Sequence, residues 1–96
     1  MLILVTYDVE TQTKAGQKRL RQVAKACQNY GQRVQNSVFE CIVSEAQLVS
    51  LKNLIGSIID TEADSVRIYY MGNELKQHVE SMGKVTSFDY TQDLIL

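Results

Sequence analysis

The sequence predicts an α+β domain of the ferredoxin-like type, with two helices on one face of an antiparallel sheet. Three observations support this prediction. Four short segments are rich in apolar, strand-forming residues, and two longer segments repeat apolar residues at helical spacing. These segments follow one another in the order βαββαβ, which is the split βαβ arrangement. The chain has 96 residues, so we expect a single domain over residues 1–96.

The first two elements are a strand and a helix. Leu2–Tyr7 is a nearly continuous apolar run, which is typical of a buried central strand, and Asp8 follows it. Thr13 is a suitable N-cap for a helix that runs from Lys14 to about Tyr30, and Gly31 is its expected stop signal. The apolar stripe of this helix comprises Leu20, Val23, Ala24 and Cys27.

The middle of the chain predicts a hairpin and a second helix. Arg33–Gln35 and Val38–Val43 form two strands that are joined at Asn36 and Ser37. Ser44 begins the next helix, because Gln47 stands three residues later in a capping box. The core face of that helix comprises Leu48, Leu51, Ile55, Ile58 and Ile59.

The last third predicts one clear strand and a less regular tail. After the acidic turn at 60–64, apolar residues alternate over 66–70, as in a half-buried strand. We expect a short helix over Glu74–Met82 and a further strand at 94–96. The segment 72–96 is therefore expected to be a C-terminal extension that docks on its own sheet or on a partner copy.

A second copy of the chain is expected because the strands are apolar on both faces. The first strand places Leu2 and Leu4 on one face and Ile3 and Val5 on the other. Both helices must cover the same face, since both crossovers are right-handed. The other face would remain an apolar patch in water, so we expect a homodimer that packs through it.

The overall composition is that of an ordinary globular protein with a net charge of -1. The sequence contains no apolar run long enough to cross a bilayer and no signal peptide, so we expect a cytoplasmic protein without membrane contact. Cys27 and Cys41 lack metal-ligand spacing and are expected to be reduced, buried thiols.

Positive charge is concentrated in one stretch. Residues 11–39 contain six basic residues and no acidic residue. Lys14, Lys18, Arg21 and Lys25 recur on one side of the predicted helix, whereas Arg19 faces elsewhere and Arg33 begins the next strand. Such a surface suits the phosphates of a nucleic acid, although a solvated helix face has the same pattern. Arg33 could hold a phosphate or pair with Glu40.

Asp8 is the candidate metal ligand, because an exposed carboxylate at the end of a central strand is well placed to bind a hard cation. One carboxylate is a poor Mg²⁺ site, but a two-fold axis would supply a second. The alternative is that Asp8 caps the following turn. Other catalytic motifs are absent, and His78, the only histidine, is expected at the surface. Tyr7 and Phe39 are expected in the core or an interface.

Three stretches together resemble the small CRISPR-associated nuclease family that partners the CRISPR integrase. They are the strand end Val5-Thr6-Tyr7-Asp8-Val9, the basic helix from Lys18-Arg19-Leu20-Arg21 to Tyr30-Gly31, and the run Arg33-Val34-Gln35-Asn36-Ser37-Val38-Phe39-Glu40. The likeness is strongest over positions 3–45, agrees with the length of the chain, and is closest to members from type I-C systems.

The resemblance implies a homodimer whose two Asp8 carboxylates share Mg²⁺ or Mn²⁺. It implies metal-dependent cleavage of double-stranded DNA or single-stranded RNA, with Tyr7, Arg19, Arg33 and Phe39 at positions that support activity. It also implies a complex with the CRISPR integrase that inserts new spacers in antiviral defence. Two alternatives remain: a non-catalytic nucleic-acid-binding scaffold for the integrase, and a ferredoxin-like module that binds a regulatory effector.

Overall fold

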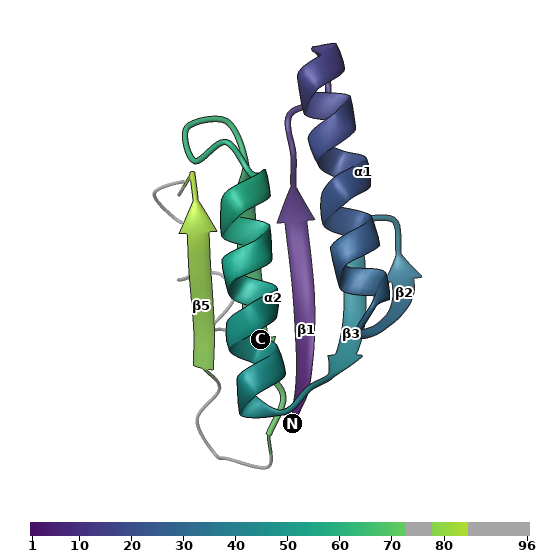
Figure 1. Ribbon diagram of the computed structural model, residues 1–96, viewed down its shortest axis with the longest axis vertical. Helices are drawn as coiled ribbons and strands as arrows, with labels where there is room; N and C mark the ends of the chain where they lie inside the picture. The colour runs from purple at the N-terminus through teal and green to yellow at the C-terminus, as the bar shows by residue number, and fades with distance from the viewer. Residues whose placement is uncertain (73–77, 85–96) are drawn as a thin grey trace.

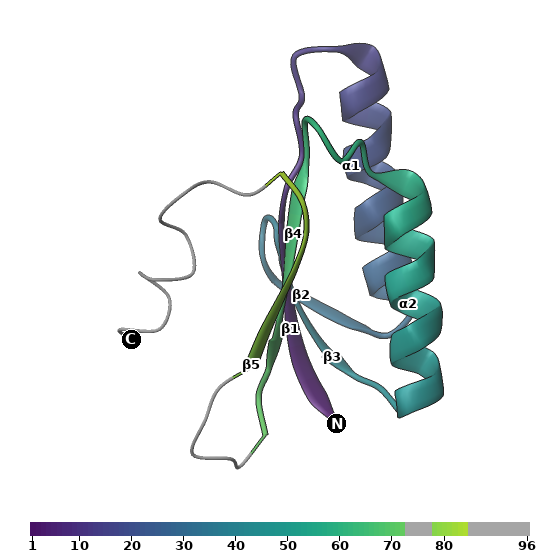
Figure 2. The same cartoon turned by 90° about the vertical axis from the view of Figure 1, so that its left-hand side faces the viewer.

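The structure is a computed structural model that describes residues 1–72 and 78–84. Its elements are β1 (Leu2–Asp8), α1 (Lys14–Gln28), β2 (Gly31–Gln35), β3 (Val38–Ile42), α2 (Glu45–Ile58), β4 (Ser65–Tyr70) and β5 (His78–Gly83). The strands form one antiparallel sheet in the order β2-β3-β1-β4-β5. Both helices cover the same face of this sheet (Figures 1 and 2). The predicted order βαββαβ is confirmed, and one further strand follows it.

The helix starts follow the predicted caps. The Thr13 hydroxyl accepts a hydrogen bond from the backbone N–H of Gly16, 2.9 Å away, at the start of α1. At the start of α2, Ser44 and Gln47 form both hydrogen bonds of a capping box. Because each cap satisfies backbone donors that the helix leaves free, these short local motifs fix where the helices begin.

The end of α1 differs from the prediction. The helix ends at Gln28 and is capped by Asn29, and Gly31 is the first residue of β2 rather than a helix stop. Gly31 is required there for close packing, because a Cβ atom would overlap the carbonyl oxygen of Glu40 on β3. The glycine therefore serves the strand pairing and not the helix terminus.

The helix predicted at Glu74–Met82 is wrong over its second half. Residues 78–83 form β5, which pairs with β4 from Ser65–Gly83 to Tyr70–His78. Glu80 on β5 binds Lys52 of α2 at 2.7 Å and also accepts a hydrogen bond from the Tyr70 hydroxyl. Cross-strand hydrogen bonds and these contacts outweigh a weak helical pattern. The strand predicted at 94–96 lies outside the described residues.

The core lies between the sheet and the helices. Its largest fully buried side chains include Phe39, Leu51 and Ile55, and the expected stripes of both helices contribute to it. Cys27 and Cys41 are free, buried thiols, as predicted, and burial raises the pKa of Cys27 to about 12. Neither described helix is long and apolar enough to span a membrane.

Neither of the two helices in the described part of the chain lies on the opposite face of the sheet (Figure 2). In β1, buried Ile3, Val5 and Tyr7 alternate with more exposed residues that point to this open face. Ile42 is 75% exposed and Leu2 is 38% exposed on it. Exposed apolar side chains therefore lie on this open face, as expected from the sequence, together with the polar residues Thr6, Glu40 and Arg67.

Candidate functional site

Asp8 is the last residue of β1 and is exposed. It follows buried Tyr7, so the alternation of the strand places its side chain on the open face of the sheet, opposite Ser65 of β4. Within residues 1–72 and 78–84, no hydrogen bond or ion pair engages its carboxylate. The turn-capping alternative is thus not realised among the described residues, and both carboxylate oxygens are available to a ligand.

A single chain does not provide a metal site in its described part. No group of three or more histidine, cysteine, aspartate or glutamate side chains lies together there. Mg²⁺ and Mn²⁺ prefer oxygen ligands, and Mg²⁺ is often held by one or two carboxylates together with waters and phosphate oxygens. Asp8 therefore fits the chemistry of such a site but supplies only part of it.

Tyr7, Phe39 and Arg33 form a second cluster on the helix-covered side of the sheet. The Tyr7 and Phe39 rings are stacked with centroids 6.2 Å apart, and the Arg33 guanidinium lies 5.2 Å from the Phe39 centroid. Tyr7 and Phe39 are buried, which confirms that they belong to the core. Arg33 pairs with Phe39 across β2 and β3, so it lies on the face away from Glu40 and does not pair with it.

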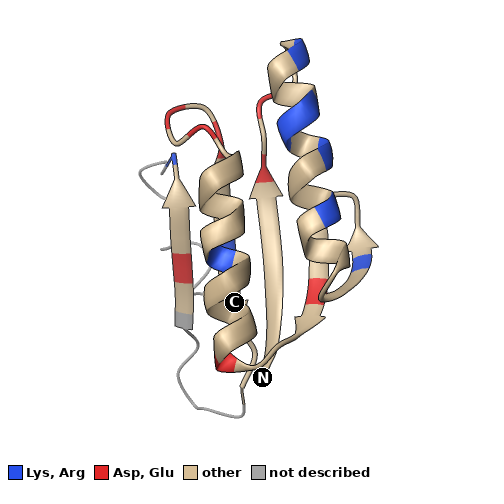
Figure 3. Ribbon diagram, in the orientation of Figure 1, with Lys and Arg blue, Asp and Glu red and all other residues tan. Residues whose placement is uncertain are grey.

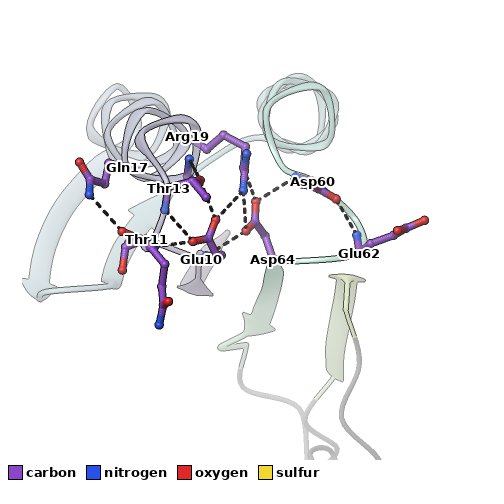
Figure 4. A network of polar contacts seen from close by, with 10 residues as sticks. Glu10, Thr11, Thr13, Gln17, Arg19, Asp60, Glu62 and Asp64 are labelled. Carbon is purple, nitrogen blue, oxygen red and sulfur yellow. Dashed lines mark hydrogen bonds and ion pairs between the residues drawn. The ribbon is translucent and has the colours of Figure 1, made fainter.

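Arg19 takes part in a third group, around the exit of β1 (Figure 4). Its Nε donates to the Asp64 carboxylate at 2.8 Å, and its Nη2 lies 3.5 Å from Glu10 Oε1. Asp64 is fully buried and also accepts hydrogen bonds from the backbone N–H groups of Glu10 and Asp60. The group joins α1, the loop after β1 and the turn before β4.

The charges of this third group stabilise one another. Burial alone would raise the pKa of Asp64, but the hydrogen bond from Arg19 and those from the backbone of Asp60 and Glu10 outweigh it and lower that pKa. The hydrogen bond to Asp64 raises the pKa of Arg19 in turn. Arg19 is therefore committed to a structural ion pair and holds the loop that follows Asp8.

The predicted basic stripe is exposed along α1. Lys14, Lys18, Arg21 and Lys25 are all exposed, and none forms an ion pair with another described residue. Figure 3 shows basic residues concentrated along α1, with others on β2 and α2, whereas acidic residues are spread over the end of β1, the turn before β4 and the strands β3 and β5. A polyanion would meet an unneutralised positive surface on this helix.

Apart from the basic stripe on α1, the structure distributes the expected site residues over three places. Asp8 lies on the open face, Tyr7, Phe39 and Arg33 lie on the helix-covered side, and Arg19 lies in the ion-pair group.

Sequence reasoning missed the buried carboxylate of Asp64. It stands in a stretch that reads as a solvated acidic turn, and its main partner, Arg19, is 45 residues away along the chain. No local pattern marks it as buried. The one hint in the sequence was that Arg19 lies on a different side of the helix from the basic stripe.

Comparisons with known sequences agree with these observations. The family model described as CRISPR associated protein Cas2 matches residues 1–79. A Halalkalibacterium halodurans protein named CRISPR-associated endonuclease Cas2 is 61% identical over 95 residues, which make up 99% of each chain. A Moorella thermoacetica protein named CRISPR-associated endoribonuclease Cas2 1 is 48% identical over 96 residues, covering 100% of both chains.

Comparisons with solved structures give the same answer for the fold. The crystal structure of Streptococcus pyogenes Cas2 at pH 6.5 is similar with a TM-score of 0.72 and 58% identity, covering 77% of this chain and 89% of that chain. A hypothetical protein from Thermus thermophilus is similar with a TM-score of 0.66 and 32% identity, covering 78% and 85% of the two chains. The two-helix, antiparallel-sheet architecture is therefore found in solved relatives.

Proposed function

The chain belongs to the CRISPR-associated Cas2 family, and we propose that two copies of it form a metal-dependent endonuclease centred on their Asp8 carboxylates. Relatives that match the chain over almost its whole length are named endonuclease or endoribonuclease, and the chain is a CRISPR-associated nuclease of this family. The metal, the second copy and the choice of nucleic acid are the parts that we propose.

One observation carries this proposal: Asp8 is exposed and unpartnered among the described residues, at the edge of an uncovered apolar face. An apolar sheet face is stabilised when it packs against another sheet about 10 Å away. A two-fold axis near the carboxyl end of β1 would then bring two Asp8 side chains to one place. The symmetric pair would supply the second carboxylate that a single chain lacks.

Different residues of the chain would bind the metal and the phosphate backbone. A bound Mg²⁺ or Mn²⁺ would supply Lewis acidity toward a phosphoryl oxygen or a nucleophilic water. The two Asp8 carboxylates would hold it, and the exposed cations of α1 would hold the phosphate backbone without reading its sequence. Arg19 would act as a positioning residue, because it contacts Asp64 and Glu10 and not Asp8.

We extend the proposal to the cellular role in antiviral defence. As the resemblance implies, the dimer would work with the CRISPR integrase in spacer acquisition, on double-stranded DNA or single-stranded RNA. The likeness to type I-C members stays a prediction from the sequence alone.

The proposal is tested by substituting Asp8→Asn, which keeps the size of the side chain and removes its charge. Cleavage of duplex DNA and single-stranded RNA is measured with Mg²⁺, with Mn²⁺ and with EDTA. We expect EDTA and the variant each to lower the rate by at least about a hundredfold, since several kcal/mol of metal stabilisation would be lost. Glu62→Gln, an exposed carboxylate in the turn before β4, is the matched control. Undiminished cleavage by the Asp8 variant would overturn the assignment.

A non-catalytic scaffold is the second candidate. It is favoured by the small catalytic apparatus, because Asp8 is the single candidate metal ligand and no group of three or more histidine, cysteine, aspartate or glutamate side chains lies together among the described residues. A scaffold would bind DNA and the integrase equally well with Asp8→Asn, and the wild-type protein would cleave neither substrate with either metal. The same assay therefore separates the two candidates.

A further inference from the structure

A cleft of about 630 Å³ lies on the helix-covered side of the sheet, away from Asp8. Its walls come from α1, from the end of β1 and from the β2–β3 hairpin. Nine residues line it: Tyr7, Leu20, Arg21, Ala24, Lys25, Gln28, Arg33, Asn36 and Ser37. Its volume is within the range of pockets that hold small organic ligands.

The cleft carries three cations and no carboxylate. Arg21, Lys25 and Arg33 line it, and none of them forms an ion pair within residues 1–72 and 78–84. Arg33 is held in place by its contact with the Phe39 ring, and its guanidinium also lies close to the Tyr7 hydroxyl. Like charges that converge on one hollow repel each other, so an anion bound there would relieve an unfavourable arrangement.

The Tyr7 hydroxyl is the second feature of this cleft. Tyr7 is 5% exposed, and within the described structure no group meets hydrogen-bond geometry with its buried hydroxyl, although the Arg33 guanidinium lies near enough to lower its pKa. Leaving such a group unpaired costs about 1–3 kcal/mol. Burial raises the pKa of Tyr7, with the nearby Arg33 acting in the opposite direction, so the hydroxyl keeps its proton at neutral pH and can donate it.

The remaining lining suits more than a bare anion. Leu20 and Ala24 offer an apolar wall, and the Gln28 and Asn36 side chains offer both amide donors and carbonyl acceptors. A ligand with a charged end and a flat, partly polar body would use all of these groups. Inorganic phosphate would use only the cationic end.

From these groups we propose that the cleft is a binding site for a nucleoside monophosphate unit, with its phosphate between Arg21, Lys25 and Arg33 and within reach of the Tyr7 hydroxyl. This unit is either a free nucleotide or the 5′-phosphorylated end of a strand, because both present the same chemistry. The site goes beyond the proposed nuclease, since it does not use Asp8 or a metal.

Binding is tested by titrating the full-length protein with AMP, adenosine and inorganic phosphate, using calorimetry and the ¹H–¹⁵N spectrum. We expect AMP to bind at least tenfold more tightly than either fragment. Lys25→Gln and Arg33→Gln should each weaken AMP binding about tenfold, which is the loss of one charge-assisted hydrogen bond. Tyr7→Phe should weaken it about three- to tenfold while leaving the fold intact.

Two comparisons make the test specific. Lys84→Gln removes an exposed lysine outside the cleft and should leave AMP affinity unchanged. Lys18→Gln removes a lysine from the same helix but not from the cleft. If Lys18→Gln weakens AMP binding as much as Lys25→Gln does, diffuse helix charge accounts for the binding and the proposal is overturned.

The source of the nucleotide is separated by competition against AMP. A 5′-phosphorylated oligonucleotide that displaces AMP at least tenfold better than its 5′-hydroxyl counterpart identifies a strand end as a ligand. Equal displacement by the two oligonucleotides identifies the free nucleotide as the ligand. No binding of AMP, together with no preference for the phosphorylated oligonucleotide, overturns the proposal. Asp8→Asn and EDTA should change neither result, so failure of the nuclease proposal and failure of this one are distinguishable.

Discussion

At the scale of single residues, Asp64 organises the region where β1 ends. Its carboxylate is buried and is shared by Arg19 of α1 and by two backbone N–H groups from separate loops. Its own carbonyl oxygen accepts a hydrogen bond from the N–H of Lys84 at 2.6 Å. Because the loop held in this way begins directly after Asp8, the buried ion pair sets where the candidate metal ligand stands.

Substitution of Asp64 should therefore destabilise the fold. Asp64→Ala removes the partner of Arg19 and leaves two backbone donors unsatisfied, so we expect a loss of about 2–4 kcal/mol in the free energy of unfolding. Urea denaturation at neutral pH measures it. Glu62→Gln, in the same turn but exposed, should stay within about 0.5 kcal/mol, and an equal loss in both variants would contradict the assignment.

The same residue predicts a pH dependence with a definite sign. The folded-state pKa of Asp64 is lowered, so its contribution is fully present above the unfolded-state value of about 3.9. It is lost as the pH falls through the lowered folded-state pKa. Urea unfolding from pH 6 to pH 2 should show a stability loss below about pH 4 that is smaller in Asp64→Asn. Equal acid slopes in the two proteins would exclude Asp64 as a contributor.

Sequence reasoning reached residues whose role follows from their position in an element. Asp8 was found because it ends an apolar strand, and Tyr7 and Phe39 were expected in the core or an interface because they lie in apolar strands that lack an RNA-binding aromatic motif. The burial of Asp64 could not be predicted from the sequence, because it depends on Arg19, 45 residues away. The cleft likewise arises from a helix and a hairpin that only the tertiary fold brings together.

At the scale of elements, α1 has two distinct sides. Val23 and Cys27 are buried on one side, and the cations of the basic stripe are exposed on the other. The buried side fixes the helix on the sheet. The exposed side is therefore free to vary in charge at little cost to stability.

This division predicts how salt controls nucleic-acid binding. Lys14→Gln combined with Lys18→Gln should weaken binding to duplex DNA and reduce the slope of log K against log salt by about 1 for each lysine. Filter binding or fluorescence anisotropy between 50 and 200 mM salt measures the slope. Lys84→Gln, an exposed lysine beyond β5, should leave the slope unchanged. Identical slopes in the double variant and the wild-type protein would rule out phosphate contacts from this part of the helix.

The elements also show why most of the fold was predictable and one part was not. Caps, apolar periodicity and the Asn36-Ser37 hairpin turn are local signals, so six elements were placed within a few residues of their observed bounds. β5 was mistaken for a helix because it is held by pairing with β4 and by the contacts of Glu80. A strand of this kind is determined by its neighbour more than by its own sequence.

At the scale of the whole molecule, the uncovered sheet face should be the dimer interface. Ile42→Lys places a charge at its most exposed apolar side chain and should shift the protein from dimer to monomer. Sedimentation equilibrium at micromolar concentration measures this shift. Val49→Lys on α2 changes a residue that is 56% exposed but lies on the helix layer, so it should leave the dimer intact. If Ile42→Lys remained dimeric, the dimer interface would have to lie on another surface.

Because both helices lie on one face of the sheet, a dimer would have two separate surfaces for binding nucleic acid. A pair joined sheet to sheet would carry its helices on the outside, so each α1 would present its cations on an opposite flank. Such a particle would be bivalent toward polyanions. Once the helix on one flank has bound a strand, the helix on the other flank meets nearby parts of the same strand at a high effective concentration. The dimer would therefore bind the strand far more tightly than either helix alone. Small changes in the monomer's affinity for nucleic acid would therefore be amplified in the pair.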